Sequence, residues 1–139
     1  MSLRGKVFQF GLLLLIGSGL AGCDGKQQDY PQREVPAGFI DDASAVENGR
    51  QLFMQKCVSC HGKLEEGRSP RAWSFEPPAP DFTETDYRQV DPAYLFWRIE
   101  VGKSVEPYLS RGSVMPGWRE YLSDRQIWQL VAYLMKRAE

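Results

Sequence analysis

Three segments of the chain have the apolar pattern or the boundaries of an α-helix. In residues 45–56, and again in residues 127–134, apolar side chains recur every three or four positions. Residues 92–101 are rich in apolar side chains and lie between turn-forming residues. No stretch shows the alternation of apolar and polar residues that is typical of a half-buried strand. The pattern predicts an all-α fold with about three main helices and long loops.

The predicted helices begin at residues that can cap the first backbone N–H groups. In the middle helix, Asp91 is the predicted N-cap, Pro92 occupies the first turn and Gly102 follows the end. The other two helices begin with the pattern of a capping box, in which two side chains bind each other's backbone N–H groups. The two boxes are Ser44 with Glu47 and Ser123 with Gln126.

The start of the chain has the features of a secretory signal. Arg4 and Lys6 precede an apolar run over residues 8–16, which small residues then end. The run is shorter than the roughly 20 residues that a helix needs to cross a bilayer. The pattern therefore favours a cleaved signal over a transmembrane helix.

Residues 20–23 have the sequence Leu-Ala-Gly-Cys, which resembles the lipobox of bacterial lipoproteins. The resemblance implies that residues 1–22 are removed and that Cys23 receives lipid. Two or more acyl chains anchor a protein stably. By the same resemblance, Asp24 favours the inner membrane, because enteric lipoproteins with Asp there tend to stay on it. The alternative is ordinary signal cleavage near Ala21, with Cys23 unmodified.

The residues after Cys23 predict a flexible tether. Residues 25–41 are polar, contain Pro31 and Pro36, and lack apolar periodicity. The predicted tether therefore covers residues 23–41, and one folded domain of roughly 100 residues, enough to bury a modest core, covers residues 42–139.

Residues 57–61 have the sequence Cys-Val-Ser-Cys-His, which is the attachment pattern of a c-type haem. Each thiol adds to a haem vinyl group, and one helical turn between Cys57 and Cys60 presents both sulfurs to neighbouring vinyls. His61 then follows as the candidate proximal iron ligand. Because His61 is the single histidine of the sequence, two histidine ligands from one chain are excluded. The pattern predicts one covalent haem c.

Met115 is the candidate for the second iron ligand. It lies in a predicted loop far along the chain, and Pro116 keeps it out of helical geometry. Of the other methionines, Met1 is lost with the signal, Met54 lies one turn before the attachment site, and Met135 neighbours the last apolar stripe. A thioether ligand raises the reduction potential relative to a second imidazole.

Residues 62–90 contain many Gly and Pro residues and predict a loop around the proximal edge of the haem. In this loop, the carbonyl of Pro70 is a candidate acceptor for the ring N–H of His61. Arg98 of the middle helix is a candidate contact to a haem propionate, with a solvated helix charge as the alternative. The aromatic residues expected to pack on the haem are Trp73, Phe75 and Phe82.

Taken together, residues 43–139 resemble the class I cytochromes c, which are small monohaem proteins. The matching positions are Gly49 and Phe53 in the first helix, Leu130 and Tyr133 in the last, the pair Met115-Pro116, and residues 67–70 and 80–83. In this family the first and last helices cross closely. Such a crossing accounts for Gly49, which costs about 1 kcal/mol relative to alanine inside a helix.

The charge of the chain is close to balanced. The formal net charge is −1, from 17 basic and 18 acidic residues. Residues 1–22 hold two of the basic residues and none of the acidic ones, so the mature part has a formal charge of −3. No basic field suggests nucleic acid. A mildly acidic surface would steer a basic partner, and it would equally serve solubility.

These observations predict an electron carrier rather than an enzyme: a lipid-anchored periplasmic monohaem cytochrome c with His61 and Met115 as axial ligands. It would pass single electrons between respiratory or periplasmic redox partners that dock at the exposed haem edge. The alternative with the same chemistry is a fixed haem c subunit of an oxidoreductase complex. A haem sensor or enzyme with an open distal site, and a thiol–disulfide oxidoreductase using Cys57 and Cys60, are further alternatives.

Overall fold

The three predicted helices are present in the structure, together with a short helix at the attachment pattern. The computed structural model describes residues 29–83 and 87–137, so the predicted signal and Cys23 lie outside the described residues. Its α-helices are α1 (Ala43–Lys56), α2 (Val58–His61), α3 (Pro92–Val101) and α4 (Asp124–Arg137). Its 3₁₀ helices are η1 (Pro70–Ser74), η2 (Tyr87–Gln89) and η3 (Leu109–Arg111). Within the described ranges there is no strand, and the all-α prediction is confirmed.

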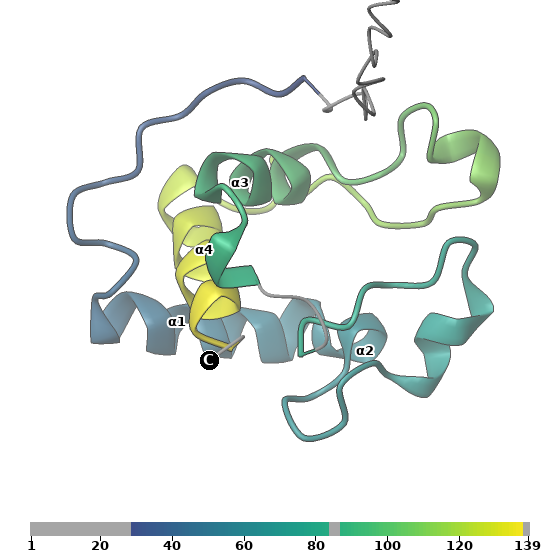
Figure 1. Ribbon diagram of the computed structural model, residues 1–139, viewed down its shortest axis with the longest axis horizontal. Helices are drawn as coiled ribbons and strands as arrows, with labels where there is room; N and C mark the ends of the chain where they lie inside the picture. Colours follow the sequence, from purple (N-terminus) through teal and green to yellow (C-terminus); the bar gives the residue numbers. More distant parts are fainter. Residues whose placement is uncertain (1–28, 84–86, 138–139) are drawn as a thin grey trace, which may run out of the picture.

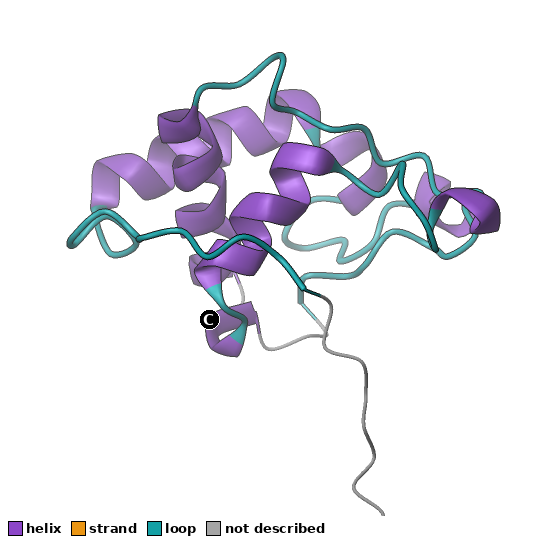
Figure 2. Ribbon diagram, turned by 90° about the horizontal axis from the view of Figure 1, so that it is seen from above, coloured by secondary structure: helices purple, strands orange, loops and turns teal. Residues whose placement is uncertain are grey.

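The helices gather at one side of the fold and the long loops at the other. Figure 1 shows α4 crossing α1, with α3 on the far side of α4 from α1. Residues 62–83 and 103–117 extend from the helices as two loops on the same side (Figures 1 and 2). This arrangement leaves the site between the helices and these loops.

The crossing of α1 and α4 depends on Gly49. A Cβ atom at Gly49 would overlap the backbone carbonyl of Gln129 and would lie 2.9 Å from Cβ of Tyr133. The prediction of a close crossing at this glycine is confirmed. The apolar stripe of α4 is buried beside the crossing, with Ile127 and Leu130 each 1% exposed.

The N-terminus of α1 differs from the prediction. The helix begins at Ala43, and Asp42 is its N-cap, with Oδ1 accepting a hydrogen bond from Ala45 N at 2.7 Å. The predicted capping box of Ser44 and Glu47 is wrong. Because the cap lies two residues earlier, both side chains are already inside the helix.

The ends of the other two main helices agree with the sequence. Asp91 caps α3 by accepting a hydrogen bond from Ala93 N at 2.8 Å, and Gly102 ends the helix with a φ of 69°. Before α4, Ser123 N donates to Gln126 Oε1 at 2.9 Å, and Gln126 N donates to Ser123 Oγ at 3.4 Å. The second predicted capping box is therefore confirmed.

The described part of the predicted tether, residues 29–41, lies against the helices. Tyr30 donates a hydrogen bond to Asp91 at 2.6 Å, and Arg33 pairs with Glu100 at 2.6 Å. Three apolar side chains of this segment pack on the core: Val35, Phe39 and Ile40. These contacts attach residues 30–40 to the domain. None of the helices in the described ranges has both the length and the hydropathy needed to cross a membrane.

The role of Gly49 can be tested by Gly49→Ala. Helix propensity alone would stabilise this variant by about 1 kcal/mol, but the added methyl group overlaps the backbone of α4. We expect the free energy of unfolding of the holoprotein to fall by about 1–3 kcal/mol, measured by denaturant titration. The control is Asn48→Ala at the exposed neighbouring position of α1. Equal stability of the two variants would contradict the close crossing.

Candidate functional site

A single helical turn places the three residues of the attachment pattern. Cys57 ends α1, where its N–H donates to Phe53 O at 2.8 Å, and α2 follows at once. The N–H of His61 donates to Cys57 O at 2.9 Å, and Gly62 ends the turn with a φ of 72°. The predicted turn between Cys57 and Cys60 is present in the structure.

A wide cavity opens between α2, α3, α4 and the two long loops. Cys57, Cys60, His61 and Met115 all lie on its wall. Its empty space is about 1140 Å³, including the part open to solvent. Other side chains of the wall are Phe75, Phe82, Tyr87, Leu95, Ile99 and Leu130.

This donor set fits a covalent haem. Two thiols, an imidazole and a thioether share one largely apolar cavity. Soft sulfur and imidazole ligands are those that haem iron takes in cytochromes c. The two thiols can form the covalent links, while the imidazole and the thioether can bind the metal.

His61 packs against two aromatic rings, and its burial favours the neutral imidazole. Its ring stacks on Phe82 with 4.7 Å between the ring centroids, and the centroid of Phe53 lies 6.3 Å away. Burial lowers the pKa of His61 to about 4, and the charges of Arg137 and Lys103 act in the same direction. An imidazole must be unprotonated to bind a metal, so the site favours the ligating form.

The carbonyl near the imidazole belongs to Pro80, and the expectation of Pro70 is wrong. Nδ1 of His61 lies 3.4 Å from Pro80 O, within hydrogen-bond reach when the proton is on Nδ1. Pro70 instead begins η1. The loop leaves the site through η1 and then returns, so the later proline meets the ring. This contact orients the imidazole and leaves Nε2 for a metal.

Met115 is fixed by the C-terminal end of α3. Its carbonyl oxygen accepts hydrogen bonds from Lys103 N at 3.0 Å and from Ser104 Oγ at 3.2 Å. Gly102 packs directly on the backbone of Met115 and Pro116, and a Cβ atom there would overlap it. Met54 is 36% exposed, and Met135 packs at the edge of the core. Of these three methionines, only Met115 lies on the cavity wall.

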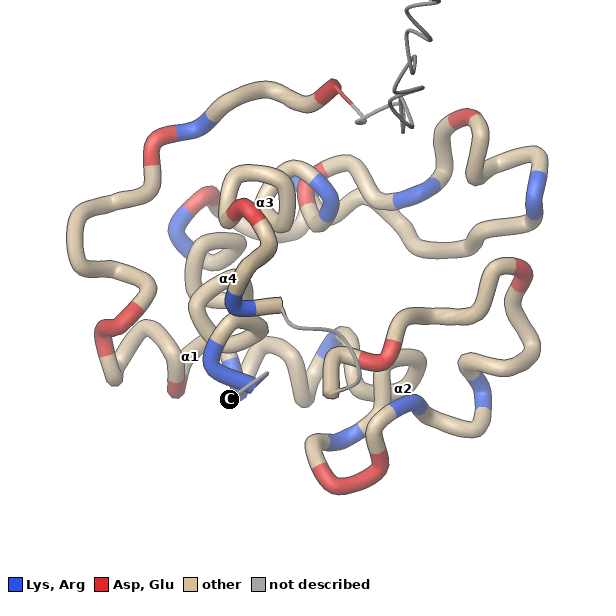
Figure 3. Tube along the Cα trace, in the orientation of Figure 1, with Lys and Arg blue, Asp and Glu red and all other residues tan. Residues whose placement is uncertain are grey.

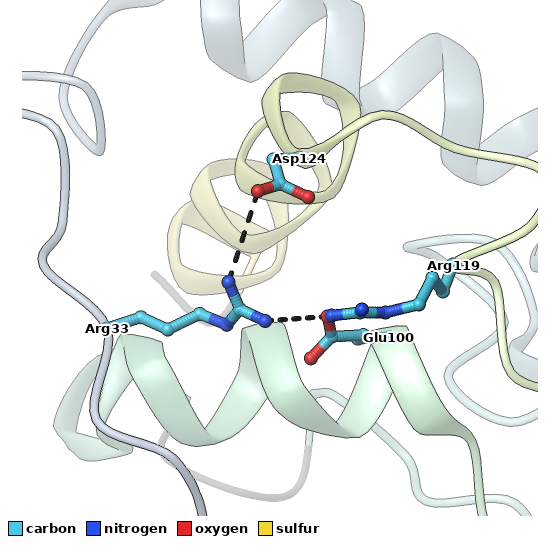
Figure 4. Close-up of polar contacts among 4 residues, drawn as sticks. All are labelled: Arg33, Glu100, Arg119 and Asp124. Atoms are coloured by element: carbon cyan, nitrogen blue, oxygen red, sulfur yellow. Dashed lines mark hydrogen bonds and ion pairs between the residues drawn. The ribbon is translucent and has the colours of Figure 1, made fainter.

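A buried carboxylate ties the segment after Met115 to the rest of the domain. Glu100 is 4% exposed and pairs with Arg33 at 2.6 Å and with Arg119 (Figure 4). Arg33 also lies 3.9 Å from Asp124, at the start of α4. The backbone N–H of Trp118 donates to Glu100 O at 3.1 Å. Glu100 therefore joins the N-terminal segment, α3 and the loop that carries Met115.

Arg98 lies on the cavity wall and is buried. Its Nη1 donates to Gly102 O at 2.8 Å. Its guanidinium lies over the rings of Trp97 and Tyr108, at 4.4 Å and 4.8 Å from their centroids. The side chain is therefore held rigidly beside the cavity, and contact with a haem propionate stays a prediction.

The three aromatic residues of the loop do not share one environment. Phe75 and Phe82 line the cavity as expected. Trp73 does not line it, because η1 turns outward and leaves this ring 67% exposed. The guanidinium of Arg68 covers one face of Trp73 at 4.6 Å.

The thiols do not have the environment of a redox pair. Burial, aided by the neighbouring Cys60, raises the pKa of Cys57 to about 12. Reactive cysteines instead have lowered pKa values, because the thiolate is the nucleophile. The pair also follows a helix, and residues 29–83 and 87–137 contain no strand that could build a βαβ unit. The site therefore disfavours thiol–disulfide exchange.

Reasoning from the sequence did not identify three residues of the site. Glu100 lies four residues after Phe96 within an apolar helix, and that spacing signals a buried charge with a partner. Arg137 continues the apolar stripe of α4, three residues after Leu134, and so lies on the buried face. For Pro80 the sequence carries no signal, since several prolines of the loop were equally placed.

Comparisons with known proteins find similarity over the folded part of the chain. The family model described as cytochrome c oxidase, cbb3-type, subunit III matches residues 44–134. A nicotinate dehydrogenase subunit of Pseudomonas putida is 25% identical over 118 residues, which are 85% of this chain and 9% of that protein. Cytochrome c-L of Methylorubrum extorquens is 50% identical over 30 residues, which are 22% of this chain and 15% of that protein. The chain thus spans a small part of the length of both relatives.

Proposed function

We propose a function from one premise: the chain belongs to the cytochrome c family described as cytochrome c oxidase, cbb3-type, subunit III. Membership implies haem-based electron transfer. We infer that the chain binds one haem c through thioethers to Cys57 and Cys60, with His61 and Met115 as axial ligands. The observation that supports this most is that all four residues line one largely apolar cavity.

Each residue of the site has a role in this function. When bound, the haem supplies an iron that accepts or donates one electron. The turn of α2 presents both thiols, Phe82 and Pro80 orient a neutral His61, and α3 holds Met115 in place. The apolar wall excludes water, and Arg98 is placed to pair with a propionate.

We place the domain on the periplasmic side of a bacterial membrane, anchored by lipid on Cys23 and with the inner membrane favoured. Two features support this placement: residues 20–23 resemble a lipobox, and c-type haem is attached outside the cytoplasm in bacteria. An anchor raises the effective concentration of the domain at membrane partners. The partners would be redox proteins that dock at the exposed haem edge.

A fixed subunit of an oxidoreductase complex is the second candidate, in place of a monomeric carrier. The similarity to a protein named as a dehydrogenase subunit favours it. The two candidates differ in what purifies with the native protein in mild detergent. Recovery as a lone monomer supports the carrier, and a stable complex that withstands dilution supports the fixed subunit.

The role of Met115 is tested by Met115→Ala. The native holoprotein should have a low-spin, six-coordinate haem and the weak ferric charge-transfer band of an iron–thioether bond. We expect the band to disappear in Met115→Ala, because alanine has no sulfur, and to persist in the control Met135→Leu. The measurement is the optical spectrum of both oxidation states. High-spin iron in the native protein, with rapid binding of carbon monoxide, would contradict the proposal and favour an open-site sensor or enzyme.

The anchor is tested by the mass of the mature protein. We expect the native chain to begin at Cys23, to carry lipid there and to sediment with membranes. Replacing residues 1–23 by an ordinary cleavable secretory signal should give a soluble periplasmic protein with the same haem spectrum. A native N-terminus without lipid, or membrane binding that survives the replacement, would contradict lipidation.

A further inference from the structure

Arg137 donates hydrogen bonds to several backbone carbonyls of the segment that follows His61. It lies in the last turn of α4, where Figure 3 shows basic residues, and it is only 6% exposed. Its guanidinium donates to Lys63 O at 2.9 Å, Gly62 O at 3.0 Å and Gly67 O at 3.3 Å. A longer contact of 3.5 Å reaches His61 O. One side chain of the C-terminal helix thus holds residues 61–67.

The shape of this segment brings backbone carbonyls together, where they need hydrogen-bond donors. Gly62 and Gly67 have φ values of 72° and 65°, and a Cβ atom on Gly62 would overlap Gly67 O. The tight turn brings several carbonyl oxygens to one place, where they repel one another. The guanidinium has five donors in a planar fork and carries no acceptor, so Arg137 satisfies several carbonyls at once.

The same guanidinium lies over two aromatic rings that neighbour His61. Its centre is 4.8 Å from the ring centroid of Phe53 and 5.9 Å from that of Phe82. Both rings also neighbour the ring of His61. Nη2 of Arg137 reaches the backbone carbonyl of His61 itself, at 3.5 Å.

The contacts of Arg137 are largely with neutral groups, namely backbone carbonyls and aromatic rings. Asp81 is an acidic side chain in its surroundings, and hydrogen bonds from Thr83, together with the charges of Arg68 and Arg137, lower the pKa of Asp81 against the effect of burial. Asp81 also accepts hydrogen bonds from Thr83, at 2.8 Å from N and 2.7 Å from Oγ1. The hydrogen bonds of Arg137 described above go to neutral carbonyls. A buried cation is costly to desolvate, which indicates a role beyond helix termination.

We propose that Arg137 is a positioning residue for the candidate ligand His61. It clamps residues 61–67 and places a fixed positive charge near His61, so that it favours the reduced state of the bound iron. The inference rests on the proposed function in taking His61 as an iron ligand. The part of the proposal in which Arg137 holds residues 61–67 in place rests only on its hydrogen bonds to that segment.

The experiment compares Arg137→Gln and Arg137→Lys as holoproteins. Its readouts are the reduction potential and the amide hydrogen exchange of residues 62–67. In Arg137→Gln we expect faster exchange and a lower potential, with the reduction equilibrium changed about tenfold, which is about 59 mV for one electron. Arg137→Lys should keep the potential within about twofold of the native equilibrium, because it keeps the charge. Its exchange should still be faster, since an ammonium cannot hold all the carbonyls.

The matched control is Arg125→Gln, which removes one positive charge from an exposed position of the same helix. It should change neither readout. The proposal is overturned if Arg137→Gln matches the control in both readouts, or if it speeds exchange without lowering the potential. If Arg137→Gln does not fold, the test rests on Arg137→Lys. Amide hydrogen exchange at the native rate in Arg137→Lys would overturn the proposal that Arg137 holds this segment in place. A native spectrum without the thioether band would contradict the proposed function but not the clamp, which the exchange rates test separately.

Discussion

The close crossing of α1 and α4 at Gly49 is the contact on which the site depends. A glycine there lets the backbone of α1 approach that of Gln129, and this close approach sets how α1 lies against α4. Because α2 follows α1 at Cys57 without a linker, the crossing also fixes the attachment turn. A larger residue at the crossing would displace the helix that carries one wall of the cavity. Packing far from the thiols therefore sets the geometry of the chemistry.

Polar side chains fix the loops that complete the cavity. On one side, Glu100 holds the segment after Met115 through Arg119 and the backbone of Trp118 (Figure 4). On the other side, Arg137 holds the turn after His61. A small domain with long loops buries little apolar area in them. Buried charges with several partners supply the rigidity that a metal ligand on a loop needs.

The sequence predicted most of the fold because its signals are local. The apolar stripe of α4, the cap at Asp91 and the turn at Cys57 all depend on residues within one or two helical turns. Gly49 was informative because its cost inside a helix requires a compensating contact. The family resemblance then supplied which helices cross, and its distal-ligand motif agrees with the earlier expectation for Met115.

Most of the predictions that proved wrong depend on contacts between residues that lie far apart in the sequence. The acceptor near His61 lies 19 positions along the chain, at Pro80, and no local pattern separates it from Pro70. Whether an aromatic residue of the loop packs inward depends on the direction of η1, which turns Trp73 into solvent. The start of α1 failed for a different reason, because Asp42 and Ser44 are both good caps and only the packed structure chooses between them.

The account depends most on the claim that one haem is attached at Cys57 and Cys60. The most direct measurement is the intact mass of the protein matured in a bacterial periplasm with a c-type maturation system, followed by mass mapping of its peptides. The account predicts one haem per chain, resistant to extraction by acidified acetone, on the peptide that contains residues 57–61. A mass without haem, or a peptide in which Cys57 and Cys60 form a disulfide, would contradict it.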